Sequence, residues 1–446
     1  MNRRDFLKIT AAISTFPGQI AIAESLTGSA GASVKLLNPY ADVDWGSWGS
    51  YKAALHLHTL QSDGWNSVRE VTGAYKKAGY SIMSITDHDF FKPNLHVRPG
   101  ELPPEKASPY PENPKPENYP ANTTWPWTDY GGHSPERLDM VGIQGNELSY
   151  RHHINSYFND YGVWYEKTNY DVPYEGVVDE NGKEIWEDDQ LLALAAAKNS
   201  MKGNVEGLGA IFSARLKAGS LAILNHPGVE DSYRWWQRQS LDWYVERFEK
   251  HSFDYLIGME VTNNNTPRRA YDEALWDQLL ARFMPARPIW GFGNDDMHKL
   301  FSTKQTFNVF YLDKCTSENV HAAMQKGHFC FCRSTRSIDY TVNDCQLDTF
   351  PQIQSIAVDQ DAGTIKINAV DYDEIKWISS PLSLEPIDDY KTSSQPWEVG
   401  NVVHTGSTLD YRNTPGIKNY VRAELLRNDG SHTQRTFTNP FGIVKI

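Results

Sequence analysis

The stretch AALHLHTLQSDGWNSVREVTGAYKKAGYSIMSITDHD, residues 53–89, decides the fold. Its first apolar run, Ala53–His58, predicts a strand, and Ser81–Thr86 predicts a second one. Between them Asn66 or Ser67 can cap a helix, apolar residues then recur at helical spacing, and a glycine provides the C-terminal stop. The stretch therefore predicts a β-α-β unit, the building block of parallel α/β folds.

Metal-ligating residue types stand where these two strands end. His56 and His58 end the first strand, Asp63 follows in an Asp-Gly pair, and Asp87-His88 follows the second strand. Alternate side chains of an ideal strand point to opposite faces, but a twist or a bulge can bring them to one ion. The strand ends of an α/β barrel meet at one mouth, where the active sites of that architecture lie. The spacing therefore indicates a metal site and favours a metallohydrolase.

The alternation of strand and helix continues through residues 51–336. Further strands are predicted at Met140–Glu147, Leu221–Asn225, Tyr255–Val261, Pro288–Gly293, Phe307–Leu312 and His328–Cys332, and helices at Asp188–Asn199, Gly207–Ala218, Trp235–Lys250, Arg268–Phe283 and Ser317–Lys326. This repeat favours an α/β barrel over a helix bundle or a sandwich. A proline-rich insertion, residues 91–136, fits a linker and a substrate cover equally well, and Trp125, Trp127 and Tyr130 lie near its end.

The pattern changes after residue 336. Residues 337–446 alternate in short runs around Gly, Asn and Asp turns, which predicts a small C-terminal β-sandwich domain. The four cysteines fall around this boundary, at Cys315, Cys330, Cys332 and Cys345. We expect them to be small buried hydrophobic residues, and a metal pair or a disulfide with Cys315 or Cys345 stays open as an alternative.

The N-terminus predicts export. Residues 1–23 read as a twin-arginine signal peptide, because Arg3-Arg4-x-Phe-Leu-Lys precedes a mildly apolar stretch that ends in Ala-x-Ala at Ala23. An N-terminal arm, residues 24–50, follows. The export machinery is thus an expected partner, and the mature protein is expected in the periplasm without membrane attachment, because no other stretch approaches the ~20 apolar residues of a membrane span. The net charge of −13 disfavours nucleic acid as a partner.

The metal-ligand candidates share one placement: all but Asp63 and His153 lie at or just past the end of an apolar run. They are His56, His58, Asp63, His88, Glu147, His153, His226, Asp296 and His298. A single histidine of this kind is more often a satisfied core or loop residue, but burying so many imidazoles and carboxylates without a cation would be costly. Nitrogen and oxygen donors with almost no thiolate suit zinc, manganese or iron.

Five motifs, in order, resemble those of the polymerase and histidinol phosphatase (PHP) superfamily. They are ALHLHTLQSDG, SITDHD, GIQGNELSY, LAILNHPG and GNDDMH, and together they span residues 53–298. The resemblance implies a distorted barrel of seven strands that holds two or three divalent metal ions. It also implies three ligand groups: His56, His58, Glu147 and Asp296 for one ion; the shared Glu147 with His153 and His226 for a second; and Asp63, His88 and His298 for a third.

The resemblance also implies roles within and around these groups. Glu147, Asp296 and His298 are the expected catalytic residues, acting around a metal-activated hydroxide. His153 is preferred to the adjacent His152 because HINSYF resembles the start of the family's strand, whereas His96 and His133 are expected to be non-ligands. Substrate anions have candidate partners in residues that follow the ligand motifs, although each alone reads as a surface residue: Arg151, Arg234, Arg238 and Lys299.

The predicted function is that of an exported metal-dependent phosphoesterase acting on a small phosphorylated molecule. Two alternatives stay open. The same site could hydrolyse a carbamate or carboxylic ester, because an aromatic-rich insertion suits an apolar substrate. A non-catalytic periplasmic protein that binds glycan or metal is the other alternative, although glycan binding needs no such cluster of ligands.

Overall fold

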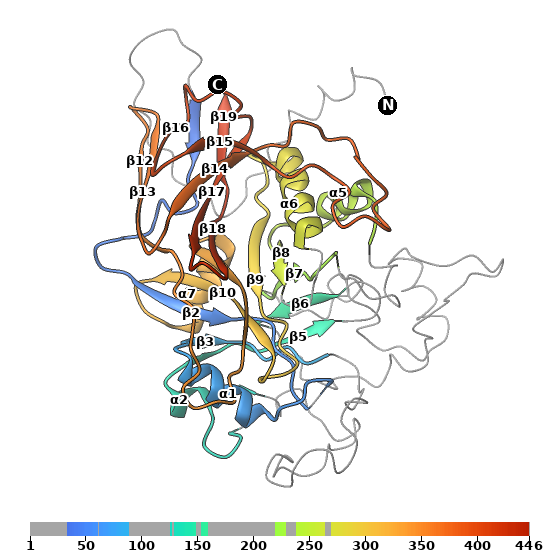
Figure 1. Ribbon diagram of the computed structural model, residues 1–446, viewed down its shortest axis with the longest axis vertical. Helices are drawn as coiled ribbons and strands as arrows, with labels where there is room; N and C mark the ends of the chain where they lie inside the picture. Colours follow the sequence, from blue (N-terminus) through green and yellow to red (C-terminus); the bar gives the residue numbers. More distant parts are fainter. Residues whose placement is uncertain are drawn as a thin grey trace, which may run out of the picture. The chain divides into compact units, whose positions relative to one another are not determined.

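The structure, a computed structural model, describes residues 34–60, 62–88, 125–126, 129–148, 153–158, 219–228, 238–263 and 269–445 (Figure 1). Val34–Val444 belong to one compact unit. The predicted signal peptide, the helices expected at Asp188–Asn199 and Gly207–Ala218, and most of the proline-rich insertion lie outside the described residues.

Helices lie between groups of strands up to α7, and the described elements after it are all strands. The helices are α1 (Val68–Lys77), α2 (Pro135–Leu138), α5 (Leu241–Lys250), α6 (Arg269–Phe283) and α7 (Ser317–Lys326). The strands up to α7 are β1 (Val34–Leu37), β2 (Gly49–Ala54), β3 (Ile82–Met83), β4 (Val141–Gly142), β5 (Gly145–Leu148), β6 (Ile154–Tyr157), β7 (Leu221–Leu224), β8 (Leu256–Asn263), β9 (Trp290–Asn294) and β10 (Thr303–Leu312). The later strands are β11 (Phe329–Ile338), β12 (Gln352–Asp359), β13 (Thr364–Val370), β14 (Glu374–Ser379), β15 (Asn401–Thr405), β16 (Thr408–Asp410), β17 (Tyr420–Asn428), β18 (Thr433–Thr438) and β19 (Phe441–Lys445).

Helix α1 forms as the sequence predicts, for local reasons. Ser67 is its N-cap, and the side chains of Ser67 and Glu70 accept each other's backbone N–H in a capping box. Gly79 follows the last turn with φ of +82°, a conformation that glycine adopts without steric cost. The helix also contacts the end of β9, because the buried Tyr75 hydroxyl donates to Asp295 Oδ2 at 2.7 Å. This bond anchors the segment that carries the candidate ligand Asp296.

Two sheets carry the strands that lead to the candidate site. The main path of the eleven-stranded sheet has the order β1-β19-β17-β18-β11-β10-β2-β3-β4, and the five-stranded sheet has the order β5-β6-β7-β8-β9. The run predicted as one strand at Met140–Glu147 is divided between them, since β4 pairs with β3 and β5 pairs with β6. The expectation of one strand there is wrong, because the chain leaves one sheet and joins the other within this short segment.

Two isolated parallel bridges join the sheets where the candidate ligands lie. Leu57 pairs with Met297, and His88 pairs with Glu147. The two sheets are thus connected by single bridges next to the candidate ligands, and the described strands do not form one continuous hydrogen-bonded sheet. The α/β class is confirmed, and the closed seven-stranded barrel stays a prediction.

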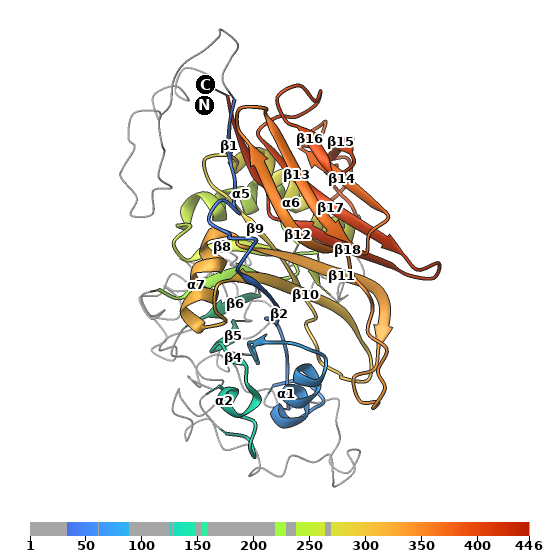
Figure 2. The same ribbon diagram turned by 90° about the vertical axis from the view of Figure 1, so that its left-hand side faces the viewer.

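The C-terminal strands extend the larger sheet and face a smaller one. Strands β12, β13 and β16 form a separate three-stranded sheet, and its Ile365 and Ile367 share a buried cluster with Val421 of β17 and Trp377 of β14 (Figure 2). Two sheets pack here face to face, as in a sandwich. Because β11 runs past residue 336 and pairs with β18, the boundary of a separate domain at that residue stays a prediction.

A buried ion pair fastens the C-terminal strands to helix α6. The Arg422 guanidinium of β17 donates to both carboxylate oxygens of Asp277 on α6, at 2.8 and 2.7 Å, and neither side chain is more than 2% exposed. Asp277 also accepts from the Tyr420 hydroxyl at 2.8 Å and from the Gly400 backbone at 2.7 Å. The carboxylate therefore has partners on both oxygens, as a buried charge requires.

The structure also bears on two expectations about individual residues and on membrane-spanning helices. All four cysteines are free thiols, and Cys330 and Cys332 are buried in the core, so the disulfide alternative is wrong in this structure. Trp125 is only 1% exposed and packs among core residues near α1, which removes it from any substrate cover; Trp127 lies outside the described residues. Within the described residues no helix is long and apolar enough to cross a membrane.

Candidate metal centre

All nine candidate ligands lie in the described residues, and the fold brings them together. His56 and His58 follow β2, Asp63 lies in the next loop, and His88 follows β3. The remaining five come from the five-stranded sheet: Glu147 lies in β5, His153 precedes β6, His226 follows β7, and Asp296 and His298 follow β9. Most of these side chains are buried, and the most open are those of Asp63 and His298, at 24% and 27% exposed.

The first predicted group has the spacing of ligands around one ion. His56 Nε2, His58 Nε2 and Glu147 Oε2 are separated by 3.1, 3.4 and 3.3 Å. Asp296 Oδ1 lies 3.3 Å from His56 Nε2 and 3.1 Å from His58 Nε2. Ligands bound tetrahedrally at about 2.0–2.1 Å are about 3.3–3.4 Å apart, so these donors fit an ion of zinc's size.

Glu147 lies between the first and second predicted groups. Its Oε2 faces the first group, and its Oε1 lies 2.9 Å from His153 Nδ1 and 3.0 Å from His226 Nε2. Oε2 also lies 3.1 Å from His88 Nδ1. One carboxylate with imidazoles at both oxygens is the arrangement expected of a ligand that bridges two ions. The structure therefore brings together the residues of both groups around Glu147.

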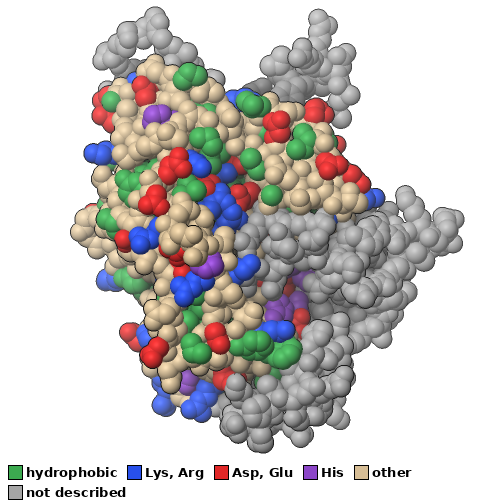
Figure 3. All heavy atoms as spheres, in the orientation of Figure 1, with side chains coloured by type: hydrophobic (Ala, Val, Ile, Leu, Met, Phe, Trp, Pro, Cys, Tyr) green, Lys and Arg blue, Asp and Glu red, His purple; other side chains and the backbone are tan. Residues whose placement is uncertain are grey.

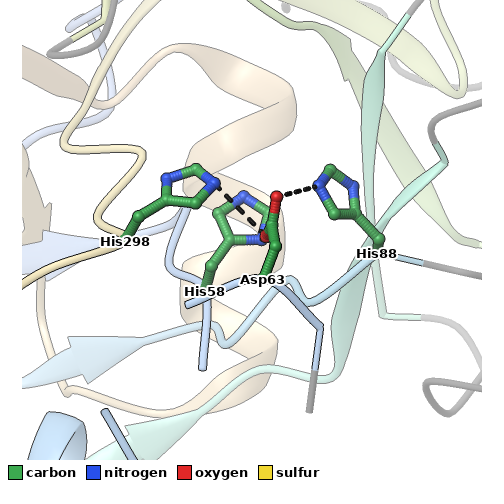
Figure 4. Close-up of side chains that lie close together, drawn as sticks. All are labelled: His58, Asp63, His88 and His298. Carbon is green, nitrogen blue, oxygen red and sulfur yellow. Dashed lines mark hydrogen bonds and ion pairs between the residues drawn. The ribbon is translucent and has the colours of Figure 1, made fainter. Parts of the chain in front are cut away.

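The third predicted group surrounds Asp63. Figure 4 shows its carboxylate between His298 and His88, beside His58. Asp63 Oδ1 lies 3.3 Å from His298 Nε2, and Oδ2 lies 3.2 Å from His88 Nε2. His88 thus faces Asp63 with one ring nitrogen and Glu147 with the other, so a neutral His88 can ligate in only one of the two groups at a time.

Hydrogen bonds at the far ring nitrogens fix two of the imidazole tautomers. His56 Nδ1 lies 2.7 Å from Glu260 Oε1, and His298 Nδ1 lies 2.9 Å from the backbone oxygen of Asp296. These oxygens only accept, so each Nδ1 carries the proton and donates it. In the neutral rings, each Nε2 then presents a lone pair toward carboxylate oxygens, an arrangement that only a proton or a cation can stabilise.

The pKa shifts have the same cause. Burial lowers the pKa of His56, but the carboxylates of Asp296, Glu260 and Glu147 outweigh it and raise that pKa well above its usual value. The pKa of His58 is raised to about 10, because Asp296 and Glu147 accept from its ring and outweigh burial. Burial alone would raise the pKa of Glu147, but neighbouring imidazoles hold it well below its usual range. Without a metal, protons on the histidines therefore balance the carboxylates.

Backbone conformation and a carboxylate clamp hold the ligand loops in place. Asp296 has φ of +45°, a left-handed conformation that is uncommon for a residue with a side chain and is often found at functional sites. Asp87, buried after β3, accepts from the Thr59 backbone at 2.7 Å, from its hydroxyl at 2.6 Å and from the Ser62 hydroxyl at 2.5 Å. Asp87 thus holds Thr59 and Ser62, which lie between the candidate ligands His58 and Asp63, without any ion.

Sequence reasoning missed Glu260, which lies in β8 and is fully buried. Besides His56, its carboxylate accepts from the His226 backbone at 2.9 Å and from the amides of Asn263 and Asn294 at 2.9 and 2.8 Å. It therefore orients two candidate ligands at once, the role of a carboxylate behind a metal-bound histidine. A charged residue inside the apolar run LIGMEVTN was the signal that could have identified it.

The other residues singled out by sequence have separate positions. His133 makes a 3.0 Å contact with the Thr72 hydroxyl, away from the ligand groups, which agrees with its expected non-ligand role. Arg238 is buried and donates to the backbone oxygens of Lys391 and Gly228, so it is a structural residue rather than a surface one. Lys299 lies over the Trp65 ring, with its ammonium 4.2 Å from the ring centre. Four other candidates lie outside the described residues: His96, Arg151, His152 and Arg234.

No family model and no curated protein matches the chain. Among solved structures, it matches a two-domain protein from Bacteroides vulgatus described as containing a predicted PHP-like metal-dependent phosphoesterase. The match has 13% identity and a TM-score of 0.38, and it covers 90% of this chain and 95% of that one.

Two further solved structures match a smaller share of the chain. A candidate metal-dependent phosphoesterase from Bifidobacterium adolescentis has 16% identity and a TM-score of 0.28. An amidohydrolase from Chromobacterium violaceum, with bound sulfate and no metal, has 14% identity and a TM-score of 0.30. Each match covers 55% of this chain and 87% of the other.

Proposed function

We propose that the protein is a metal-dependent phosphoesterase that acts on a small phosphorylated molecule. The observation that carries the proposal is the position of Glu147, whose two carboxylate oxygens face separate sets of imidazoles at 2.9–3.4 Å. A carboxylate shared in this way is expected where two ions lie close together, and paired ions are a common means of phosphoester hydrolysis.

The donor set supports zinc, manganese or iron as the bound ions. Imidazole nitrogens and carboxylate oxygens make up the whole cluster, and none of the four cysteines belongs to it. Bound divalent ions would supply the Lewis acidity that lowers the pKa of a water molecule and withdraws charge from the phosphoryl oxygens. His56, His58, Glu147 and Asp296 would hold one ion, and the other ligands would hold one or two more.

The chain's own residues then have distinct tasks. Glu147 and Asp296 hold negative charge against the surrounding imidazoles, and Glu260 keeps the Nε2 of His56 turned toward the centre. His298 is the most open of the candidate ligand histidines, and its ring is held by the Asp296 backbone oxygen. It is therefore the imidazole best placed to meet a substrate that arrives from solvent. When its Nε2 holds a proton instead of an ion, it can give that proton to the departing alcohol.

Metal-depleted protein reconstituted with zinc, manganese or iron tests this proposal. The assay compares p-nitrophenyl phosphate, bis(p-nitrophenyl) phosphate and p-nitrophenyl acetate, with the Glu147→Gln variant as the inactive control. Metal-dependent release of p-nitrophenol from a phosphate ester is the expected result. Hydrolysis of the acetate alone would replace the proposal with a carboxylic ester hydrolase. A wild-type protein that binds no metal and hydrolyses none of the three esters would overturn it.

Export is part of the proposal and rests on the N-terminal motif. A twin-arginine route carries folded proteins, which suits an enzyme that is loaded with metal before it leaves the cytoplasm. Replacing Arg3-Arg4 with Lys-Lys should leave the precursor in the cytoplasm, as measured by cell fractionation. An unchanged periplasmic yield would remove the twin-arginine interpretation without touching the proposed activity.

A further inference from the structure

A small aromatic and basic surface adjoins the open side of the candidate centre. The chain continues from Asp63 through Gly64 to Trp65, and from His298 to Lys299 and then to Phe301 two residues later. Figure 3 shows histidine side chains at the surface with basic and hydrophobic side chains near them. We refer to Trp65, Lys299 and Phe301 as the platform.

The platform residues contact one another. The Lys299 ammonium lies 4.2 Å from the centre of the Trp65 ring, and the ring of Phe301 meets Trp65 edge to face at 5.8 Å. Phe301 is 46% exposed, so one side of its ring is open to solvent. Within the described residues the Lys299 ammonium has aromatic contacts and no ion pair. The platform thus offers an apolar ring surface and a cation that has no anionic partner in the described part of the chain.

The backbone beneath the platform is held in place. The Trp65 N–H donates to the His298 backbone oxygen at 2.7 Å, and the Asn66 side chain accepts from the Leu300 N–H at 3.1 Å. Gly64 is required here, because a Cβ at this position would lie 2.5 Å from the His58 backbone. Trp65 and Lys299 are therefore fixed relative to the candidate ligands, as residues of a preorganised subsite should be.

We propose that the platform binds the leaving group of the substrate, and that this group is a ring that carries an anionic substituent. The inference rests on the proposed function, since the group placed there is the alcohol released when a phosphate ester is cleaved at the centre. The ring would pack on Trp65 and Phe301, and the anion would meet Lys299. Such contacts hold the substrate beside the ions without touching the phosphoryl group, so their loss should appear in KM.

Three esters separate the parts of this subsite: 4-carboxyphenyl phosphate has ring and anion, phenyl phosphate has the ring alone, and ethyl phosphate has neither. Lys299→Met keeps an apolar side chain against Trp65 and removes the charge. It should raise KM for the carboxyphenyl ester about tenfold relative to phenyl phosphate, the effect of one charge-assisted hydrogen bond. Phe301→Ser should raise KM for both ring esters relative to ethyl phosphate. Lys366→Met, on the exposed face of β13, is the matched control.

A binding measurement makes the subsite testable apart from catalysis. Saturation-transfer NMR on the metal-free protein compares benzoate with acetate, and benzoate should bind the wild type about tenfold more tightly than Lys299→Met. Equal benzoate affinity in the two proteins, or an equal KM change for all three esters, overturns the subsite. If the metal-loaded wild type hydrolyses none of the esters, the proposed function fails, and the benzoate comparison alone decides whether the platform binds a ring with an anion.

Discussion

Replacement of Glu260 by glutamine tests how the centre is held together. The carboxylate accepts four hydrogen bonds, all from N–H groups: Oε1 from His56 and Asn294, and Oε2 from the His226 backbone and Asn263. A glutamine oxygen can keep one pair of these donors, but its NH₂ group must then face the other pair. Two buried donors lose their acceptor, which costs about 1–3 kcal/mol each, or about 2–6 kcal/mol in all.

The same substitution should weaken metal binding. With glutamine, either the His56 ring or the His226 backbone loses the acceptor that orients it, and residues of this kind typically affect metal affinity about 10–100-fold. The free energy of unfolding of the metal-free protein is measured by urea denaturation, and zinc affinity by competition with a chromophoric chelator. Glu249→Gln, an exposed residue of α5, is the control and should change neither.

Two outcomes of this experiment would refute the reasoning. If Glu260→Gln kept wild-type zinc affinity, Glu260 would not orient the ligands, whatever happened to stability. If affinity fell while the free energy of unfolding stayed the same, the buried hydrogen bonds would not have the strength assigned to them.

The remaining predictions concern the ligands, a buried ion pair and pH. Glu147→Gln, which removes a charge from both sides of the cluster, should reduce metal content and lower turnover by about three orders of magnitude or more. Asp63→Asn should cause a smaller loss, because it touches the third group alone; equal effects in metal analysis and kinetics would contradict the bridging role. Asp277→Asn leaves the buried Arg422 charge without the carboxylate that pairs with it. The free energy of unfolding, measured by urea denaturation, should fall by about 3–5 kcal/mol, and a fall below about 1 kcal/mol would contradict this prediction. Because the pKa of His58 is about 10 in the metal-free protein, protons compete with metal for its ring. Zinc affinity should therefore rise between about pH 6 and 9, and zinc binding should release protons. Calorimetry that finds no released protons would contradict this prediction.

The sequence by itself determined the elements whose stability is local. The capping box of Ser67 and Glu70 and the glycine at position 79 are enough to define both ends of α1, because each acts within one turn of helix. Seven of the nine candidate ligands could also be proposed from position, since polar residues at the ends of apolar runs lie at strand ends, and strand ends gather at one edge of a parallel sheet. Asp63 and His153 do not lie at such ends and were proposed from the motifs around them.

Only the tertiary structure decided which distant residues meet. The sequence pattern could not divide Met140–Glu147 between two sheets or pair β11 with β18, because strand partners depend on long-range contacts rather than on periodicity. Trp125 belongs to the core although its proline-rich surroundings suggested a surface loop. Glu260 acquires its role from His56, which is 204 residues away in the chain and 2.7 Å away in space. A buried carboxylate is defined by the donors around it, and no stretch of sequence contains them all.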